Sequence, residues 1–192
     1  MPNFGYGFKE EKGRQYAYAQ RYDVNASYKD LACVCDNVRY RRIEDAIGYL
    51  ELAAEGKQAV RFRHYNKRLA HRKELGGRKG KFPMLASSYV LDLVRNLGAN
   101  AEAKGLMEPV IAHISANKQQ IYPRTAPRGR WRRNNYETAR LEAVACEAKG
   151  FEKARLVGKV KTDLKVMKKE KVKIKKEVKQ EQKVHEKVAI PA

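Results

Sequence analysis

Long hydrophobic runs, clustered cysteines and acidic residues are all scarce in this sequence of 192 residues. No stretch approaches the ~18 uninterrupted apolar residues of a membrane-spanning helix, and residues 1–8 contain no apolar run typical of a secretory signal. The three cysteines are Cys33, Cys35 and Cys146. One residue separates the first two, fewer than the about two to four of a zinc-ligand pair, and no second pair follows. We therefore expect no membrane span, zinc knuckle or disulfide framework, and instead three reduced core thiols in a cytosolic protein.

Signals of enzymatic chemistry are also lacking. Gly80 and Lys81 resemble the end of a phosphate-binding loop, but Phe82 stands where Ser or Thr is required and Leu75 where the first Gly belongs. No convergent carboxylates offer a site for catalytic metal ions. The histidines have neither ligand nor triad spacing, and we interpret them as phosphate or packing contacts (His64, His71, His113 and His185). From the sequence we therefore expect that the protein is not an enzyme and that it binds neither a cofactor nor a metal ion.

The shortage of acid leaves a large positive charge. Forty-two lysines and arginines face twenty-two aspartates and glutamates, giving a net charge of +20. A small domain needs a net charge of only ~2–8 to stay soluble. The excess repels itself in a compact chain, so we infer a polyanionic partner, with phosphate backbones first and anionic lipid second. Because 43% of the residues are hydrophobic, a packed core is also expected.

The charge divides the chain into two parts. Residues 151–192 hold fourteen basic and six acidic residues, hence +8, and have no aromatic residue after Phe151. Residues 1–150 carry the other +12. We expect a globular domain over 1–150 and a Lys/Glu-rich C-terminal tail over 151–192, either a basic helix or a disordered segment that orders on its partner.

Apolar spacing predicts three helices in the domain. The first follows Ser27, with Ser27 and Asp30 as a weak capping box and Leu31, Val34, Cys35 and Val38 facing inward. The second runs from Ile43 until Gly56 stops it. The third begins at Pro83 and ends at Gly105. Its predicted buried side comprises Leu85, Val90, Leu93, Val94, Leu97 and Ala101.

Three other segments read as strands. Residues 16–22 alternate, with Tyr16, Tyr18 and Tyr22 as candidates for one face. Residues 110–114 are β-rich, and residues 139–145 alternate again. The last two flank a long polar stretch, which suggests an antiparallel pair with an extended connection.

The first concentration of charge lies between residues 61 and 81. Nine basic residues stand there against Glu74 alone, with aromatic residues interleaved. Gly76, Gly77 and Gly80 favour irregular structure. A solvated loop is the simpler interpretation, but so much like charge favours phosphate binding, with aromatic and guanidinium planes stacking on unpaired bases. The RNA-binding candidates are Arg61, Arg63, Tyr65, Lys67, Arg68, His71, Arg72, Arg78, Lys79 and Lys81.

The second concentration runs from residue 118 to residue 133 and contains no acid. It has almost nothing aliphatic after Ile121, so it cannot form a core. We expect a protruding hairpin threaded among phosphates. Its RNA-binding candidates are Lys118, Arg124, Arg128, Arg130, Trp131, Arg132 and Arg133.

Several short motifs follow one another in a set order. Residues 61–67 (RFRHYNK) precede His71-Arg72, and Lys81-Phe82-Pro83 leads into the third helix, which ends in residues 100–106 (NAEAKGL). Next come His113-Ile114, Asn117-Lys118, Pro123-Arg124, Gly129-Arg130 and Leu141-Glu142. Over roughly residues 15–148, this ordered set resembles the large-subunit ribosomal protein family called L-twenty-two in bacteria and L-seventeen in eukaryotes, in its archaeal or eukaryotic form.

The resemblance implies a fold and a function. The fold is α+β, with three helices on a small three-stranded antiparallel sheet and a long β-hairpin over about 110–147. The implied protein binds large-subunit ribosomal RNA, supports assembly, and sits in the cytoplasmic ribosome. Its hairpin tip, here residues 124–133, would line the peptide exit tunnel opposite a loop of ribosomal protein L-four and beside the nascent peptide.

Two alternatives stay open from the residues alone. One is a non-ribosomal architectural nucleic-acid-binding protein, which would bind duplex DNA at least as well as structured RNA. The other is a membrane-surface protein that uses the tail, but the tail lacks an aromatic or Leu-rich face beyond Phe151.

Overall fold

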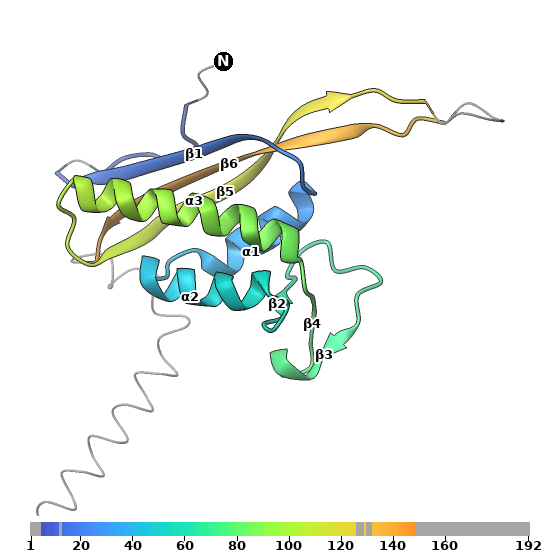
Figure 1. The fold of residues 1–192 in the computed structure, drawn as a ribbon, viewed down its shortest axis with the longest axis horizontal. Helices are drawn as coiled ribbons and strands as arrows, with labels where there is room; N and C mark the ends of the chain where they lie inside the picture. Colours follow the sequence, from blue (N-terminus) through green and yellow to red (C-terminus); the bar gives the residue numbers. More distant parts are fainter. Residues whose placement is uncertain (1–4, 12, 126–128, 130–131, 149–192) are drawn as a thin grey trace, which may run out of the picture. The chain divides into compact units, whose positions relative to one another are not determined.

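The computed structural model describes residues 5–11, 13–125, 129 and 132–148 of the chain (Figure 1). The predicted tail over 151–192 lies outside the described residues, as do three of the RNA-binding candidates, Arg128, Arg130 and Trp131.

The main sheet has three antiparallel strands in the order β1-β6-β5. Strand β1 spans Tyr16–Val24, β5 spans Pro109–Tyr122 and β6 spans Tyr136–Glu147. In the central strand β6, Leu141, Ala143 and Ala145 are fully buried and belong to the hydrophobic core. Two of these three residues are alanines, and such small side chains let helices approach the sheet closely. The predicted strands at 110–114 and 139–145 are the buried halves of these longer strands.

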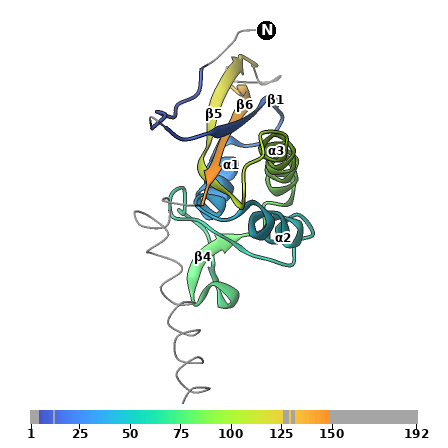
Figure 2. The ribbon, with the colours of Figure 1, turned by 90° about the vertical axis from the view of Figure 1, so that its left-hand side faces the viewer.

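Three helices cover one face of this sheet (Figure 2). Helix α1 spans Tyr28–Val38, α2 spans Ile43–Ala54 and α3 spans Met84–Ala103. Helix α1 packs on β5, α3 packs on β1 and β6, and α2 packs mainly on α3. The predicted α+β fold with three helices on a three-stranded antiparallel sheet is confirmed. Of the helices in the described part of the chain, none combines the length and apolar composition of a bilayer span.

Most of the predicted helix faces are correct, with two exceptions at helix starts. Val90, Leu93, Val94 and Leu97 are buried on α3, but Leu85 is 59% exposed because it lies in the first turn, at the edge of the core. The prediction of a capping box at the start of α1 is also wrong. Ser27 occupies the N-cap position without a side-chain capping hydrogen bond, and the carboxylate of Asp30 binds Lys81 instead.

The hairpin formed by β5 and β6 extends beyond the end of β1, the remaining strand of the sheet. Strand β1 pairs with β6 as far as the Val24–Ala139 pair. Beyond that point β5 and β6 pair with each other, from Lys118–Ala139 to Tyr122–Tyr136, and an isolated bridge joins Thr125 to Arg133. In Figure 1 this two-stranded ribbon projects well past β1 and the helices. The expected hairpin is therefore a paired ribbon for most of its described length.

The glycine-containing segment between α2 and α3 is more regular than its sequence predicts. Strand β2 (Val60–Arg61), strand β3 (His71–Arg72) and strand β4 (Arg78–Lys81) form a second antiparallel sheet in the order β2-β4-β3. A 3₁₀ turn over Lys73–Leu75 joins β3 to the glycines. A Cβ at Gly80 would lie 2.5 Å from the Val60 carbonyl oxygen. Gly80 therefore permits the strand pairing that glycine content alone argues against.

Candidate nucleic-acid interface

The segment over residues 61–82, which we call the basic loop, is anchored to the core at its first residues. Phe62 is 3% exposed and belongs to the core cluster. The side-chain amide of Asn37 on α1 donates hydrogen bonds to the carbonyl oxygens of Arg61 and Cys33, each at 2.7 Å. Because Asn37 is itself buried, these bonds fix the loop to α1 at its root.

Few of the basic side chains in the loop are paired with a carboxylate. Within the described residues, the ion pair between Lys81 and Asp30, at 2.8 Å, is the one that the loop makes. Burial, together with repulsion from Arg78 and Arg63, lowers the pKa of the Arg61 guanidinium. The positive charge of the basic loop is therefore largely unneutralised within the described part of the chain, and the loop forms an electropositive surface.

Some predicted binding residues also have structural contacts. The guanidinium of Arg72 lies 5.2 Å from the centre of the Phe82 ring, and its Nε donates to the Gly80 carbonyl oxygen at 3.2 Å. Lys81 lies 5.2 Å above the Phe62 ring in addition to its pair with Asp30. These contacts orient the two cations across the small sheet. The exposed side chains are Arg63, Tyr65, Lys67, Arg68, His71 and Arg78, while Arg61 and Lys79 are half-buried.

Two residues of the loop hold a strained backbone. Tyr65 and Arg68 have φ values of 51° and 62°, in the left-handed region that few non-glycine residues adopt. Between them, the Asn66 side-chain amide donates to the Arg63 carbonyl oxygen at 3.3 Å. The turn leaves the Tyr65 ring 50% exposed. Strain of this kind is retained where the surrounding structure enforces it, and functional sites are common places for it.

The hairpin carries its cations beside aromatic rings. Arg124 lies 4.9 Å from the centre of the Tyr136 ring, which in turn packs at 5.8 Å against Tyr122. Arg132 and Arg133 are exposed near the tip. At the other end of the ribbon, Lys118 pairs with Glu137 at 2.8 Å. The hairpin therefore carries both cations and aromatic rings along its length.

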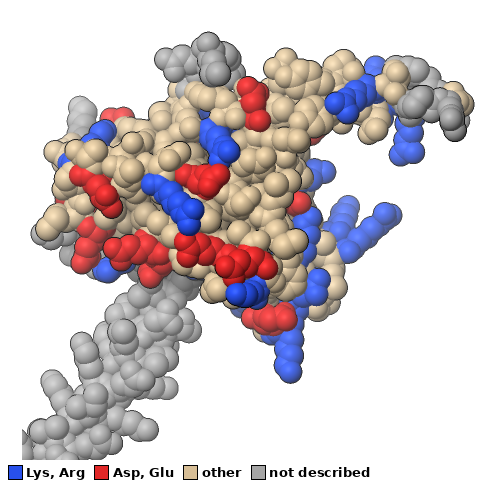
Figure 3. Space-filling model, viewed as in Figure 1, with Lys and Arg blue, Asp and Glu red and all other residues tan. Residues whose placement is uncertain are grey.

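Apart from Glu74 in the basic loop and Glu137 on the hairpin, most carboxylates on the face drawn in Figure 3 lie away from these two segments. Helix α2 carries Glu44, Asp45 and Glu51 and has no Lys or Arg within its bounds. Figure 3 shows carboxylates gathered over the helices, while lysines and arginines project from the basic loop and the hairpin. A polyanion is therefore attracted to the loop and the hairpin and repelled from the α2 surface.

Comparison with known proteins identifies the family. A family model described as ribosomal protein L22p/L17e matches residues 19–144, which include the basic loop and the hairpin. The chain is 37% identical over 131 residues to the large ribosomal subunit protein uL22 of Archaeoglobus fulgidus, covering 67% of this chain and 84% of that protein. The uL22 of Staphylothermus marinus is 30% identical over 155 residues, covering 77% and 99%. The chain belongs to the L22p/L17e family of ribosomal proteins.

Membership of the L22p/L17e family confirms the predicted resemblance and its archaeal type. The family is a structural component of the ribosome without enzymatic activity, which agrees with the predicted class and with the predicted location in the cytoplasmic ribosome.

The structure of this L22p/L17e protein brings two further residues, absent from the predicted set, to the interface. Lys118 of the hairpin lies 4.7 Å from the centre of the Tyr28 ring, and Tyr65 of the basic loop contacts the same ring edge-on at 6.0 Å. Tyr28 and its neighbour Lys29 therefore join the two predicted segments into one surface. An aromatic and a basic residue side by side at a helix start are the signal in the sequence that could have indicated this.

Proposed function

We propose that the chain is a structural constituent of the large ribosomal subunit that binds large-subunit ribosomal RNA through the basic loop and the hairpin. The observation that carries this proposal is the separation of charge. The loop's cations make one ion pair among the described residues, and the adjacent hairpin is basic and exposed. On the face drawn in Figure 3, most of the carboxylates lie over the helices. Ribosomal RNA supplies the missing counter-charge at close spacing.

The hairpin is the part suited to reach into the RNA. It extends past the third strand as a ribbon, and its described residues from Asn117 to Thr125 are largely exposed. We propose that its tip lines the peptide exit tunnel, where it contacts the nascent peptide and a loop of ribosomal protein L-four, while the globular part supports subunit assembly. The +8 of residues 151–192 adds to the attraction for RNA.

Competition between nucleic acids tests the RNA-binding part. The full chain is bound to a labelled transcript of archaeal large-subunit ribosomal RNA and challenged with unlabelled RNA or duplex DNA at equal phosphate concentration. We expect the RNA competitor to displace the transcript and the duplex DNA to fail. Displacement by both to the same extent would instead support an architectural nucleic-acid-binding protein.

Crosslinking from the tip tests the tunnel part. A photoreactive residue in place of Arg132 is incorporated into ribosomes carrying a stalled nascent chain, with the same residue in place of Glu44 as the control. We expect crosslinks to the nascent chain from position 132 and none from position 44. Absence of nascent-chain crosslinks from the tip would overturn the tunnel assignment.

A further inference from the structure

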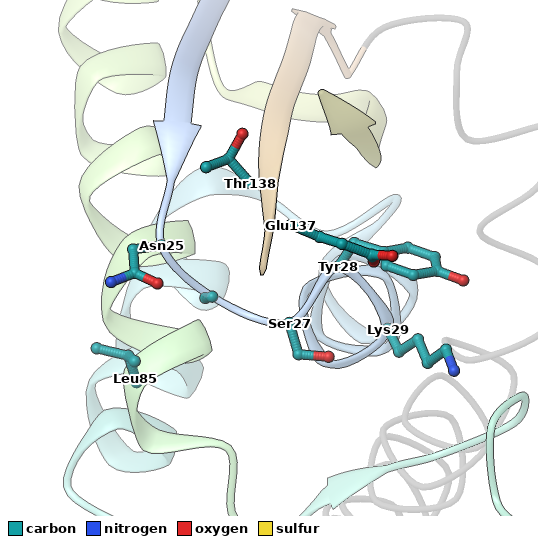
Figure 4. A pocket seen from close by; sticks show the side chains of 8 residues that line it. Asn25, Ser27, Tyr28, Lys29, Leu85, Glu137 and Thr138 are labelled. Atoms are coloured by element: carbon teal, nitrogen blue, oxygen red, sulfur yellow. The ribbon is translucent and has the colours of Figure 1, made fainter. Parts of the chain in front are cut away.

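A cavity of about 430 Å³ lies at the root of the hairpin, where β6, α1 and the start of α3 meet. Figure 4 shows Tyr28 and Glu137 projecting into the same region, with Asn25 and Leu85 on the wall nearer α3. Its size falls within the ~300–1,000 Å³ typical of small-ligand sites. The lining residues are Asn25, Ala26, Ser27, Tyr28, Lys29, Leu85, Glu137 and Thr138.

An aromatic pair lies at the edge of this cavity, where Tyr28 belongs to the lining and Tyr65 does not. The Tyr28 ring forms part of the wall, and the Tyr65 ring meets it edge-on with the ring centres 6.0 Å apart. Tyr28 packs against the core, whereas Tyr65 is 50% exposed. A hydrogen bond with Tyr28 raises the pKa of the Tyr65 phenol. A base could therefore stack on an aromatic surface that is already in place.

The charges around the cavity are arranged unevenly. The ammonium of Lys29 lies 5.6 Å from the centre of the Tyr65 ring and has no carboxylate partner among the described residues. On the other side, Glu137 lines the cavity and pairs with Lys118 at 2.8 Å. One end can therefore attract a phosphate, and the other can accept hydrogen bonds through a carboxylate.

We propose that this cavity receives a single unpaired nucleotide of the bound RNA, with its base against Tyr65 and Tyr28 and its phosphate at Lys29. The inference rests on the proposed RNA binding and adds one defined site to it. Glu137 accepts hydrogen bonds from the donors on the base edge. Guanine, which presents an imino and an amino donor side by side, fits this carboxylate better than uracil does.

A paired helix does not suit this site. Bases inside an A-form duplex are stacked on one another, and their deep major groove does not admit side chains. Phosphates of a duplex would meet Glu137 as well as Lys29. An extruded nucleotide instead separates its base from its phosphate, as the cavity separates carboxylate from ammonium.

Binding of matched RNA hairpins tests the proposal with the full chain. One probe is a fully paired hairpin, and the others carry one bulged G or one bulged U in the same stem. We expect the bulged-G probe to bind about tenfold more tightly than the paired probe, because stacking one base on an aromatic side chain has about that effect. The bulged-U probe should fall between them.

Three variants assign the preference to the cavity. Tyr65→Leu should bring the ratio of bulged-G to paired affinity close to one. Glu137→Gln should reduce the discrimination between G and U, and Lys29→Gln should weaken the bulged probes more than the paired one. Tyr6→Leu is the matched control, since Tyr6 is 36% exposed but packs on Tyr18 in β1.

The outcomes separate this inference from the function on which it rests. Equal affinity for paired and bulged probes, or an unchanged ratio in Tyr65→Leu, would overturn the nucleotide site while leaving RNA binding intact. Failure of the chain to bind any of the RNA probes at low salt would overturn both.

Discussion

Ser115 on β5 donates a hydrogen bond of 2.7 Å to the carboxylate of Glu142, its direct partner on β6. Glu142 is 2% exposed although it faces away from the helices. The N-terminal segment over residues 5–11 covers it, with the Gly7 amide donating at 3.4 Å and Phe8 packing against Tyr16 and His113. The side chain of Arg140 also donates to this carboxylate. The buried carboxylate of Glu142 therefore links the outer face of the sheet to the N-terminal segment through hydrogen bonds.

Neutralising that acid should destabilise the fold. We expect Glu142→Gln to lower the free energy of unfolding by about 3 kcal/mol, because it breaks a buried charge pair and leaves Arg140 without its carboxylate. Urea unfolding at neutral pH measures the change. Glu102→Gln, on the exposed surface of α3, should have almost no effect. Equal stability of the two variants would show that Glu142 contributes nothing.

The same acid makes stability depend on pH. Burial alone raises the pKa of Glu142, but hydrogen bonds from Ser115, Arg140, His113 and the Gly7 amide outweigh it and lower the pKa below its usual value. A lowered folded-state pKa stabilises the protein above the unfolded pKa of about 4.3, and this stabilisation disappears as the pH falls through the folded pKa. The difference between wild type and Glu142→Gln should therefore be full at pH 7 and shrink in acid. A difference that grows on acidification would contradict this assignment.

Gly80 should be essential to the basic loop. A Cβ at this position would lie 2.4 Å from Leu75 Cδ1 and 2.5 Å from the Val60 carbonyl oxygen. We expect Gly80→Ala to cost about 1–3 kcal/mol of unfolding free energy through overpacking and to weaken RNA binding by displacing β4. Thermal unfolding measures the loss of stability, and a binding assay with RNA measures the loss of affinity.

Gly48 provides the matched control for that substitution. It lies inside α2, and a Cβ there would meet nothing within 4 Å. Gly48→Ala should stabilise the chain by about 0.5–1 kcal/mol because alanine is the better helix former. Similar destabilisation by both substitutions would mean that close packing at Gly80 is not the cause.

The sequence predicts the core elements well because their signals are local. Val90, Val94 and Leu97 recur at helical spacing, and Leu141, Ala143 and Ala145 alternate, so each element displays its own buried face. The prediction that Leu85 is buried is wrong because spacing does not reveal where a helix extends past the sheet beneath it.

The remaining features depend on contacts between distant residues. The second sheet forms because Gly80 fits against Val60, and the single surface joining loop and hairpin forms because Tyr28 lies between Tyr65 and Lys118. Glu142 is buried by residues more than a hundred positions away in the chain. No local pattern encodes such pairings, so charge composition indicates two candidate binding segments but not that they adjoin in space.

The outer hairpin should be dispensable for folding. Beyond the Lys118–Ala139 pair, the ribbon has no third strand among the described residues. Deleting residues 120–135 leaves a short connection to close the turn. We expect cooperative unfolding with little loss of stability in circular dichroism, together with weaker binding to ribosomal RNA. Loss of cooperative unfolding would show that the hairpin is structural.

Cations of the basic loop should determine how binding responds to salt. Each neutralised phosphate contributes about 0.7–0.9 to the slope of log affinity against log salt concentration. Arg78→Gln should reduce that slope by nearly one unit, while Lys57→Gln, whose lysine pairs with Glu55 beyond α2, should leave it unchanged. A slope reduced equally by both would indicate a general charge effect without a defined interface.

The central claim is that the basic loop faces ribosomal RNA and the α2 surface does not. Tethered cleavage tests it directly, because the native thiols of Cys33, Cys35 and Cys146 are buried and burial raises the pKa of Cys33 to about 11. A cutting reagent is attached to a single new cysteine, Lys73→Cys on the loop or Asp45→Cys on α2, in assembled large subunits. We predict strong cleavage of ribosomal RNA from position 73 and weak cleavage from position 45. Equal or reversed cleavage would contradict the account.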